Sequence, residues 1–479
     1  MEKILFVASE AVPFIKTGGL ADVMGALPKE LAAKGMDVRL VIPKYSLIKD
    51  EAKQRMKQVT TGIVNLAWRQ LYYGVDEIEQ DGVKVYFIDN EWYFKRDRLY
   101  GYADDDERFA YFCRAVLTML PRIGFQPDVI HGNDWHTGML GVFLKEDFYH
   151  DDFYKNMKFV YTIHNLKYQG IYPASIMQDI IGLPQHLFDN GNLECDGCVN
   201  YMKSGMVYAD YITTVSPTYA QEITYPYFGE RLDGYIRSNQ DKVVGIINGL
   251  DEDAYNPETD PYIAQTYTSK DARAGKRVNK DALRKELGLR IKRGVPMVAM
   301  VSRLVEDKGM DLVTRIMDEL VEDDVQLVIV GTGDWQYEEA FRDLARRYPT
   351  KVSANIMFNE GLAHRVYAAA DIFLMPSRYE PCGLSQLIAL KYGAVPVVRE
   401  TGGLRDTVVP FDKYKNQGNG LTFPKFNAHE LLFTAKTALG YYEDTALWDH
   451  IVKNAMESDY SWKRSAQAYA DLYKKVLNR

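Results

Sequence analysis

Short apolar runs rich in β-branched residues recur along the whole chain, and the stretches between them carry apolar residues at the spacing of amphipathic helices. Runs of this kind are typical of strands in a parallel sheet that helices cover on both faces. The pattern therefore predicts an α/β fold. The predicted strands are 4–8, 38–43, 83–89, 128–131, 159–164 and 211–216 in the first half, and 297–302, 326–331, 353–358, 372–376 and 395–399 in the second.

The two series of strands are separated near residue 248. There a turn-rich stretch, 246–251, runs into Tyr255-Asn256-Pro257. We expect a first domain over residues 1–248 and a second over 249–459, with charged surface helices in 260–294. A last helix over 462–477, within the closing segment 460–479, has its apolar residues spaced four, three, four and three, so that face must pack on another element.

One short sequence occurs in both halves. Thr17-Gly18-Gly19-Leu20 reappears as Thr401-Gly402-Gly403-Leu404, each time after a predicted strand and before a helix. Open parallel sheets bind their ligands at that position. The repeat favours two halves of similar architecture.

Composition and charge narrow the class of protein. Of the 479 residues, 47% are hydrophobic and 26% charged, which indicates a globular protein and excludes disorder. The net charge of −8 leaves no basic field for nucleic acid. No apolar run is long enough to span a membrane, and the first apolar run is too short for a signal peptide and is predicted as a strand. Only four cysteines occur, which fits a reducing cytoplasm.

Two strand ends carry glycines or cations suited to a phosphate. Lys16 precedes Gly18 and Gly19, whose N–H groups are free to approach an anion. Arg303 and Lys308 follow the strand 297–302, where two cations suit a leaving diphosphate. The alternative is a loop with solvated basic residues.

The strongest candidate follows the strand 372–376. Pro381 is suited to open a helix, which would leave the N–H groups of Cys382, Gly383 and Leu384 as an anion site beside Glu380. A carboxylate beside an anion site is costly unless it has a function, such as holding a sugar hydroxyl or stabilising an electron-poor carbon. The alternative is that Glu380 caps the helix.

Histidines follow two further strands. His131, Asp134 and His136 match no common zinc spacing, and together with Asn133, Trp135 and His164 they are better suited to hydrogen-bond a polyhydroxylated substrate. A structural role for each histidine is the alternative.

Three other patterns are interpreted as non-functional. The acidic stretches 104–106 and 251–253 are expected to be solvated loops, although their D-x-D spacing occurs in metal-dependent sugar transferases. Cys195 and Cys198 lie in a polar stretch with no second pair, and we expect no redox or zinc site there.

The motifs together resemble the family of bacterial glycogen synthases and plant starch synthases. They occur in order over nearly the whole chain: Lys16 to Val23, His131 to His136, Thr162 to Asn165, Asn248 to Asp251, Ser302 to Leu304, Lys308-Gly309, Glu380 to Leu384 and Thr401 to Leu404. The resemblance implies a GT-B fold: two Rossmann-like domains that face each other across a deep cleft, with the last helix returning to the first domain. It implies transfer of glucose from ADP-glucose to the non-reducing end of an α-1,4-glucan, with retention at the anomeric carbon and with no metal or other cofactor.

The resemblance also implies residue roles. Lys16, the Gly18 and Gly19 backbone, Arg303 and Lys308 would bind the diphosphate, and Glu380 would contact the donor glucose and support an oxocarbenium-like transition state. His164 would hydrogen-bond the sugar, Asp134 and Asp22 would place hydroxyl groups, and Phe358 would contact the nucleobase. The remaining substrate-binding residues would be Asn248, Cys382, Gly383 and Leu384.

Three rival functions remain at this point. A nicotinamide-dependent oxidoreductase is disfavoured because no G-x-G-x-x-G follows the first strand. A non-catalytic glucan-binding protein would use some of the 34 tyrosines and 6 tryptophans, but leaves the cations and Glu380 unexplained. A transferase that uses a UDP-sugar fits the spacing equally well.

Overall fold

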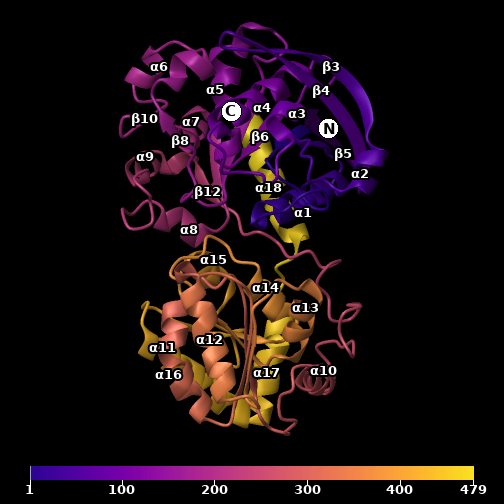
Figure 1. Ribbon diagram of the computed structural model, residues 1–479, viewed down its shortest axis with the longest axis vertical. Helices are drawn as coiled ribbons and strands as arrows, with labels where there is room; N and C mark the ends of the chain where they lie inside the picture. The colour runs from indigo at the N-terminus through magenta and orange to yellow at the C-terminus, as the bar shows by residue number, and fades with distance from the viewer. Residues whose placement is uncertain (1, 479) are drawn as a thin grey trace. The chain divides into compact units, whose positions relative to one another are not determined.

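The chain folds into two α/β units, and the computed structural model describes residues 2–478 (Figure 1). The first unit comprises the residues up to Val215, Ala220–Ile246 and the residues from Trp462 onward. The second comprises Ser216–Tyr219 and Ile247–Ser461. The residues of α8 (Pro217–Glu222) are divided between the two units, those up to Tyr219 in the second and those from Ala220 in the first.

The first unit is built on a nine-stranded sheet, which is parallel except for β4 and β3 at one edge. In sheet order its strands are β12 (Val243–Gly245), β11 (Tyr211–Thr214), β7 (Lys158–Ile163), β6 (Val129–Asn133), β1 (Lys3–Val7), β2 (Asp37–Pro43), β5 (Val83–Asp89), β4 (Arg69–Gln80) and β3 (Lys57–Leu66). A separate small sheet has the order β8 (Ile171–Pro173), β10 (Cys198–Asn200) and β9 (Glu194–Cys195).

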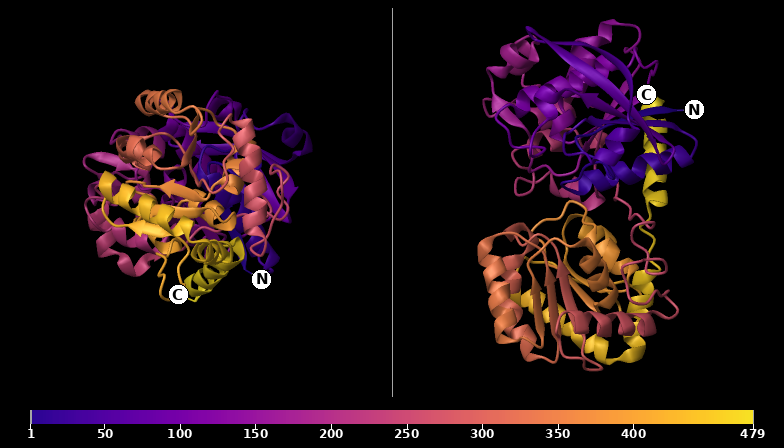
Figure 2. Two further views of the ribbon diagram at one scale, coloured as in Figure 1. Left: turned by 90° about the horizontal axis from the view of Figure 1, so that it is seen from below. Right: turned by 45° about the vertical axis from the view of Figure 1, so that its right-hand side comes forward.

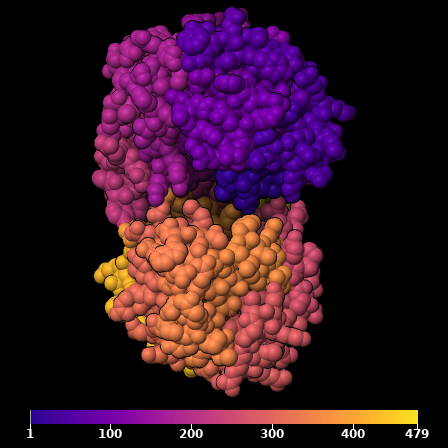
Figure 3. Space-filling view, viewed as in Figure 1, coloured from indigo at the N-terminus to yellow at the C-terminus, as the bar shows by residue number. Residues whose placement is uncertain are grey.

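Its helices are α1 (Gly19–Ala33), α2 (Asp50–Arg55), α3 (Glu91–Phe94), α4 (Asp105–Met119), α5 (Met139–Glu146), α6 (His186–Asp189), α7 (Tyr201–Tyr208), α9 (Asp233–Ser238) and α18 (Trp462–Leu477). On the face shown in Figure 3, indigo residues from the start of the chain and magenta residues from nearer its middle form the surface of this unit.

The second unit is built on a six-stranded, all-parallel sheet. In sheet order its strands are β15 (Val352–Asn355), β14 (Gln326–Val330), β13 (Met297–Val301), β16 (Ile372–Met375), β17 (Val395–Arg399) and β18 (Leu421–Phe423). Helices lie on both faces of this sheet, as Figure 2 shows. They are α10 (Ala272–Glu286), α11 (Met310–Glu322), α12 (Trp335–Arg347), α13 (Glu360–Ala369), α14 (Ser385–Lys391), α15 (Gly402–Thr407), α16 (Ala428–Glu443) and α17 (Thr445–Met456).

The predicted α/β class and its parallel strands are confirmed, since the ends of each predicted strand lie within three residues of those of an observed one. The sequence pattern missed the β3–β4 hairpin, which adds antiparallel strands. β3 begins with the exposed residues Lys57, Gln58 and Val59, and only Val64 and Leu66 of this strand are buried. A strand at the edge of a sheet lacks the apolar run of a fully buried one, so its pattern resembles a loop.

The expectation of surface helices in 260–294 was wrong in one respect. α10 is the helix of this segment, but Lys276, Lys280 and Arg284 on it are buried. The ammonium of Lys276 donates to the carbonyls of Tyr367, Ala368 and Tyr392. Hydrogen-bond partners and ion pairs inside the unit thus compensate for the burial of these charges.

α18 begins and ends at the predicted residues, and its five predicted apolar positions are all buried. It packs on α1 in the first unit, as Figures 1 and 2 show in yellow. The hydroxyl of Tyr473 on this helix lies 2.7 Å from Nδ1 of His131 on β6. Among the described residues, none of the helices is long and apolar enough to cross a membrane.

Candidate active site

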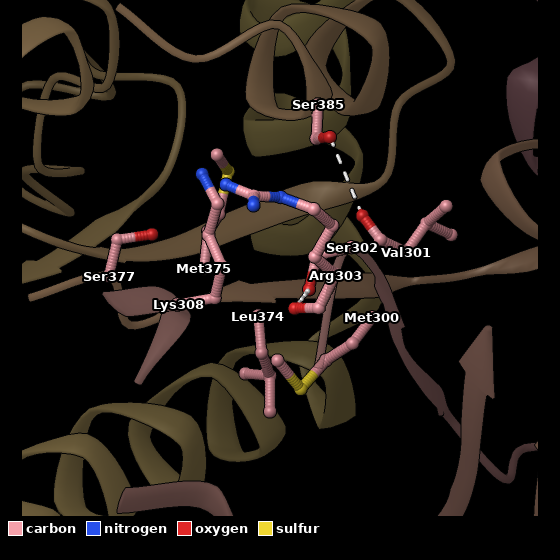
Figure 4. Close-up of a pocket in the computed structure, with 9 residues that line it drawn as sticks. All are labelled: Met300, Val301, Ser302, Arg303, Lys308, Leu374, Met375, Ser377 and Ser385. Atoms are coloured by element: carbon pink, nitrogen blue, oxygen red, sulfur yellow. Dashed lines mark hydrogen bonds between the residues drawn. The ribbon is translucent and has the colours of Figure 1, made fainter. Parts of the chain in front are cut away.

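A pocket of about 190 Å³ opens at the carboxyl ends of β13 and β16 in the second unit. Its lining includes Arg303 and Lys308, and Figure 4 shows both side chains directed to the same side of it. Parallel strands present their carboxyl ends on one edge, so the two cations and the loop after β16 are brought together there. The sequence analysis placed these residues after strand ends, and only the family resemblance assigned them to one donor.

Glu380 lies beside this pocket and is paired with one of its cations. Its Oε2 is 2.5 Å from Nζ of Lys308 and accepts a hydrogen bond of 3.0 Å from the hydroxyl of Ser377. The Glu380 side chain is only 9% exposed and that of Lys308 21%. Burial of a carboxylate is costly without such partners, and the lysine and the serine provide them.

The alternative that Glu380 caps a helix is wrong. α14 begins at Ser385, and its N-cap residue, Leu384, makes no side-chain cap hydrogen bond. The expectation that Pro381 opens this helix is also wrong, since the turn from Pro381 to Leu384 precedes it. Binding of an anion by the N–H groups of Cys382, Gly383 and Leu384 stays a prediction. Burial raises the pKa of the Cys382 thiol to about 12, so this cysteine is not a thiolate at neutral pH.

Other predicted residues of the second unit differ in burial. Asn248 is buried, and its Oδ1 has no hydrogen-bond partner among the described residues. An unsatisfied buried acceptor is costly, and a ligand hydroxyl would satisfy it. Phe358, three residues after β15, is 90% exposed, which leaves its ring free to stack on a planar ligand.

The two copies of the repeated Thr-Gly-Gly-Leu sequence serve different purposes. A Cβ on Gly402 would lie 1.9 Å from the carbonyl oxygen of Glu380, and one on Gly403 2.1 Å from that of Cys382. The N–H of Gly403 donates to the carbonyls of Glu380 and Pro381, at 3.1 and 3.2 Å. The second copy therefore packs against the Glu380 loop and supports it.

The first copy leaves room for a ligand. A Cβ on Gly18 would make only an ordinary contact of 3.7 Å with Glu10, and one on Gly19 would meet nothing within 4 Å. Gly18 is the N-cap of α1, so the free N–H groups of the first turn follow it. Lys16 lies beside this turn, half exposed, with its Nζ 2.7 Å from Oδ1 of Asp22.

Glu10, which the sequence analysis passed over, anchors this turn. Its buried Oε2 accepts hydrogen bonds from the N–H and the hydroxyl of Thr17, at 2.5 and 2.8 Å. Burial raises the pKa of this carboxyl above its ordinary value. Glu10 lies three residues after β1, at the end of the strand where parallel sheets place functional side chains. The other candidates were identified by positions of this kind, and the same signal could have identified Glu10.

Asp134 and His164 lie together at the carboxyl ends of β6 and β7. Asp134 has φ of 57° and ψ of 178°, a conformation that is strained for any residue other than glycine. Its Oδ1 accepts a 2.8 Å hydrogen bond from the N–H of His164. Burial raises the pKa of Asp134 to about 7, and it lowers that of His164 to about 3.

The tautomer of His164 follows from its neighbour. The amide nitrogen of Asn133 donates to the carbonyls of Val7 and His131, which turns its Oδ1 towards Nε2 of His164 at 2.9 Å. The neutral imidazole therefore carries its proton on Nε2, and Nδ1 remains an acceptor.

His131 and His136 are both buried, but only the ring of His131 has hydrogen-bond partners among the described residues. Its Nδ1 lies beside the hydroxyl of Tyr473, and its Nε2 lies 2.6 Å from the hydroxyl of Thr162, which gives it a structural role. The ring of His136 packs on Trp135 and Tyr100, and neither of its nitrogens has a hydrogen-bond partner among the described residues.

The patterns set aside in the sequence take defined structures. Asp105 and Asp106 are buried at the start of α4, where Asp105 pairs with the buried Arg108, so the expectation of a solvated loop there was wrong. Cys195 and Cys198 lie opposite each other across the β9–β10 turn, and all four cysteines are free.

Comparison with known proteins assigns the chain to a family. The model of the starch synthase catalytic domain matches residues 3–238, and that of the glycosyl transferases group 1 domain matches residues 280–444. The glycogen synthase of Geobacillus thermodenitrificans is 52% identical over 477 residues, which cover 100% of this chain and 98% of that protein. The chain belongs to the glycogen synthase family. Another family member, the glycogen synthase of Clostridium beijerinckii, is 52% identical over 478 residues, covering 100% of both proteins.

Solved structures agree with the membership of the glycogen synthase family. The catalytic domain of starch synthase IV from Arabidopsis thaliana, bound to ADP and acarbose, has a TM-score of 0.91 and 32% identity, with 100% of both chains covered. Sucrose-phosphate synthase from Thermosynechococcus elongatus, with a TM-score of 0.61, 18% identity and 100% of both chains covered, shares the fold. The protein is a glycosyltransferase with the GT-B fold.

Proposed function

We propose that this protein elongates glycogen by transferring glucose from ADP-glucose to the non-reducing end of an α-1,4-glucan, with retention at the anomeric carbon. The observation that carries the proposal is the Lys308–Glu380 pair beside the pocket that Arg303 also lines. Two cations suit a leaving diphosphate, and a carboxylate beside them suits the positive charge that develops on the sugar.

In this proposal the second unit handles the nucleotide sugar. Lys308 and Arg303 take up the charge that grows on the diphosphate as the bond from it to C1 breaks. Glu380 stabilises the oxocarbenium-like transition state. Phe358 stacks on the adenine, and Asn248 and the N–H groups of 382–384 contribute hydrogen bonds to the donor.

The first unit supplies the acceptor side and further contacts to the donor. Lys16 and the N–H groups of Gly18 and Gly19 bind diphosphate oxygens, and Asp22 places a hydroxyl. His164, neutral at physiological pH, accepts a hydrogen bond from a sugar hydroxyl through Nδ1. Asp134 orders the His164 backbone, whose carbonyl lies near the anomeric carbon in this proposal.

Retention is explained by attack on the same face of the sugar. The 4-hydroxyl of the acceptor forms the new bond to C1 on the side from which the diphosphate leaves, and its proton passes to the departing diphosphate. A double displacement would require a carboxylate about 5 Å from an acid partner. No residue stands out in the sequence as that nucleophile, so the proposal uses none.

The free thiols fit the cytoplasm as the place of the reaction.

The test is release of nucleoside diphosphate by the purified protein with glycogen as acceptor, comparing ADP-glucose with UDP-glucose in the presence of a chelator. Glycogen-dependent release of ADP that survives the chelator supports the proposal. Release from UDP-glucose alone would keep the transferase and replace the donor. Binding of glycogen without release from either donor would contradict catalysis.

A further inference from the structure

The loop 376–384, which carries Glu380, joins β16 to α14, and its geometry decides where the carboxylate lies. The Ser377 hydroxyl bonds the carboxylate directly, and the Gly403 N–H bonds the carbonyls of Glu380 and Pro381. The carbonyls of Ser377 and Arg378, on the other side of Glu380 in the sequence, need donors as well.

Arg399 supplies those donors. It is the last residue of β17, directly after Val398, which pairs with Met375 at the end of β16. Its Nη1 donates to the carbonyl of Arg378 at 2.5 Å and lies 3.5 Å from that of Ser377. The side chain is half-buried, so the charge-assisted hydrogen bond is shielded in part from water.

Arg378 extends this support to the segment that carries Lys308. Its N–H donates to the carbonyl of Asp307 at 2.9 Å, and its Nη2 lies 2.7 Å from Oε1 of Glu306. Glu306, Asp307 and Lys308 form one short 3₁₀ turn. The two loops that present Glu380 and Lys308 are therefore tied together through Arg378.

One aromatic ring links the two arginines. The guanidinium of Arg378 lies 4.5 Å from the ring centroid of Phe426, and that of Arg399 lies 5.9 Å from it. Contacts of this kind orient a guanidinium as well as attract it. Phe426 thus restricts the direction from which Arg399 reaches the loop carbonyls.

We propose that Arg399 is a positioning residue for glucosyl transfer: by holding the carbonyls of Arg378 and Ser377, it fixes Glu380 relative to Lys308. The inference rests on the proposed function and deepens it. Electrostatic stabilisation of a transition state depends on groups that are already in place, and displacement of one by about 1 Å can lower a rate on the order of 100-fold. Without Arg399 the loop carbonyls turn to water and the carboxylate loses its fixed direction.

Three variants separate positioning from general stability. Arg399→Met keeps the stem of the side chain and removes its donors, and Arg399→Lys keeps a cation with a donor. Arg405→Met is the matched control, because Arg405 is an exposed arginine on the adjoining helix α15. We expect Arg399→Met to lower kcat roughly 10- to 100-fold with a donor KM within about 3-fold of wild type. Arg399→Lys should recover part of the loss, and Arg405→Met should behave as wild type.

A second measurement does not depend on turnover. Hydrogen exchange of the backbone in 376–384 should be faster in Arg399→Met than in wild type and unchanged in Arg405→Met, while exchange in α11 stays the same. Wild-type kcat together with unchanged exchange in Arg399→Met overturns the inference, as does an equal loss in the Arg405→Met control. If the wild type itself transfers no glucose from ADP-glucose, the proposed function fails, and the exchange result still decides whether Arg399 orders the loop.

Discussion

Nζ of Lys308 lies 2.5 Å from Oε2 of Glu380, so the two charges neutralise each other beside the pocket. In the proposed mechanism, the diphosphate of the donor competes with Glu380 for the lysine. As Lys308 turns to the leaving group, the carboxylate would become available to the sugar, whose charge rises in the transition state. In that mechanism the pair connects the binding of the donor with the chemistry that follows.

Replacing Glu380 should reduce turnover without weakening donor binding. Glu380→Gln keeps an acceptor for Lys308 and Ser377 but removes the negative charge, and Glu380→Ala removes both. We expect kcat to fall on the order of 100- to 1,000-fold in each, with little change in donor KM, because the interaction is made mainly in the transition state. Steady-state release of ADP measures both constants. A variant with near-normal kcat would remove Glu380 from the mechanism.

Replacing Lys308 should affect both rate and stability. Lys308→Ala leaves a carboxylate that is 9% exposed without its cation, so we expect a lower Tm as well as a kcat reduced on the order of 100-fold. Lys308→Arg keeps the charge and should retain more of both. The control is Lys270→Ala, at an exposed lysine of the same unit. Unchanged turnover in Lys308→Ala would show that the lysine does not act on the leaving group.

Asp134 should make the stability of the protein depend on pH. Its pKa is about 7 in the folded chain and roughly 4 in an unfolded one, so folding favours the protonated form. The contribution of Asp134 to the stability of the wild type therefore falls as the pH rises from about 4 to about 7, and above that range it stays constant. Asp134→Asn has no proton to lose there.

Thermal unfolding at several pH values measures this effect. The Tm of Asp134→Asn minus that of wild type should increase between about pH 4 and pH 7 and then level off. Asp152→Asn, at a carboxylate that is 91% exposed, should show no such trend. A constant difference for Asp134→Asn across the range would mean that Asp134 titrates as an ordinary aspartate.

The two glycine pairs should respond oppositely to alanine. Gly403→Ala forces a Cβ to within 2.1 Å of the Cys382 carbonyl oxygen, so we expect a loss of stability of about 1–3 kcal/mol and of activity. Gly19→Ala meets nothing within 4 Å and should fold as wild type, but bind the donor more weakly because the methyl group occupies the space for the anion. Tm and donor KM, measured for both, test this. A destabilised Gly19→Ala with a normal KM would contradict it.

Much of the fold was predictable because buried parallel strands have a simple signature. The runs 83–89 and 395–399 match β5 and β17 in full, because both strands lie inside their sheet and are rich in apolar residues. The hairpin of β3 and β4 was not, because β3 begins with three exposed residues and β4 includes the charged residues Asp76, Glu77 and Glu79. Lys276 was not predicted as buried either, because its partners are backbone carbonyls of distant helices, which no local pattern shows.

The site was predictable to the extent that it depends on strand ends. Arg303 and Lys308 follow β13, and Glu380 follows β16, its neighbour in the sheet. A parallel sheet binds ligands at the carboxyl ends of its strands, so a position after a predicted strand indicates a candidate residue. The role of the second Thr-Gly-Gly-Leu copy was not predictable, since only the folded chain shows which glycine packs on backbone. Likewise, Ser377 and Arg399 act through hydrogen bonds to the Glu380 loop, and a serine or an arginine carries no sequence signal for that.

The most direct test of the account is analysis of the product formed from ADP-glucose and a maltooligosaccharide of defined length. The account predicts an acceptor longer by one or more glucose units, whose new anomeric protons give the NMR signals of α-1,4 linkages, and a roughly 100-fold or greater loss of that product with Glu380→Gln. A product with the inverted anomer, or an acceptor that stays unextended while ADP-glucose is hydrolysed, would contradict it.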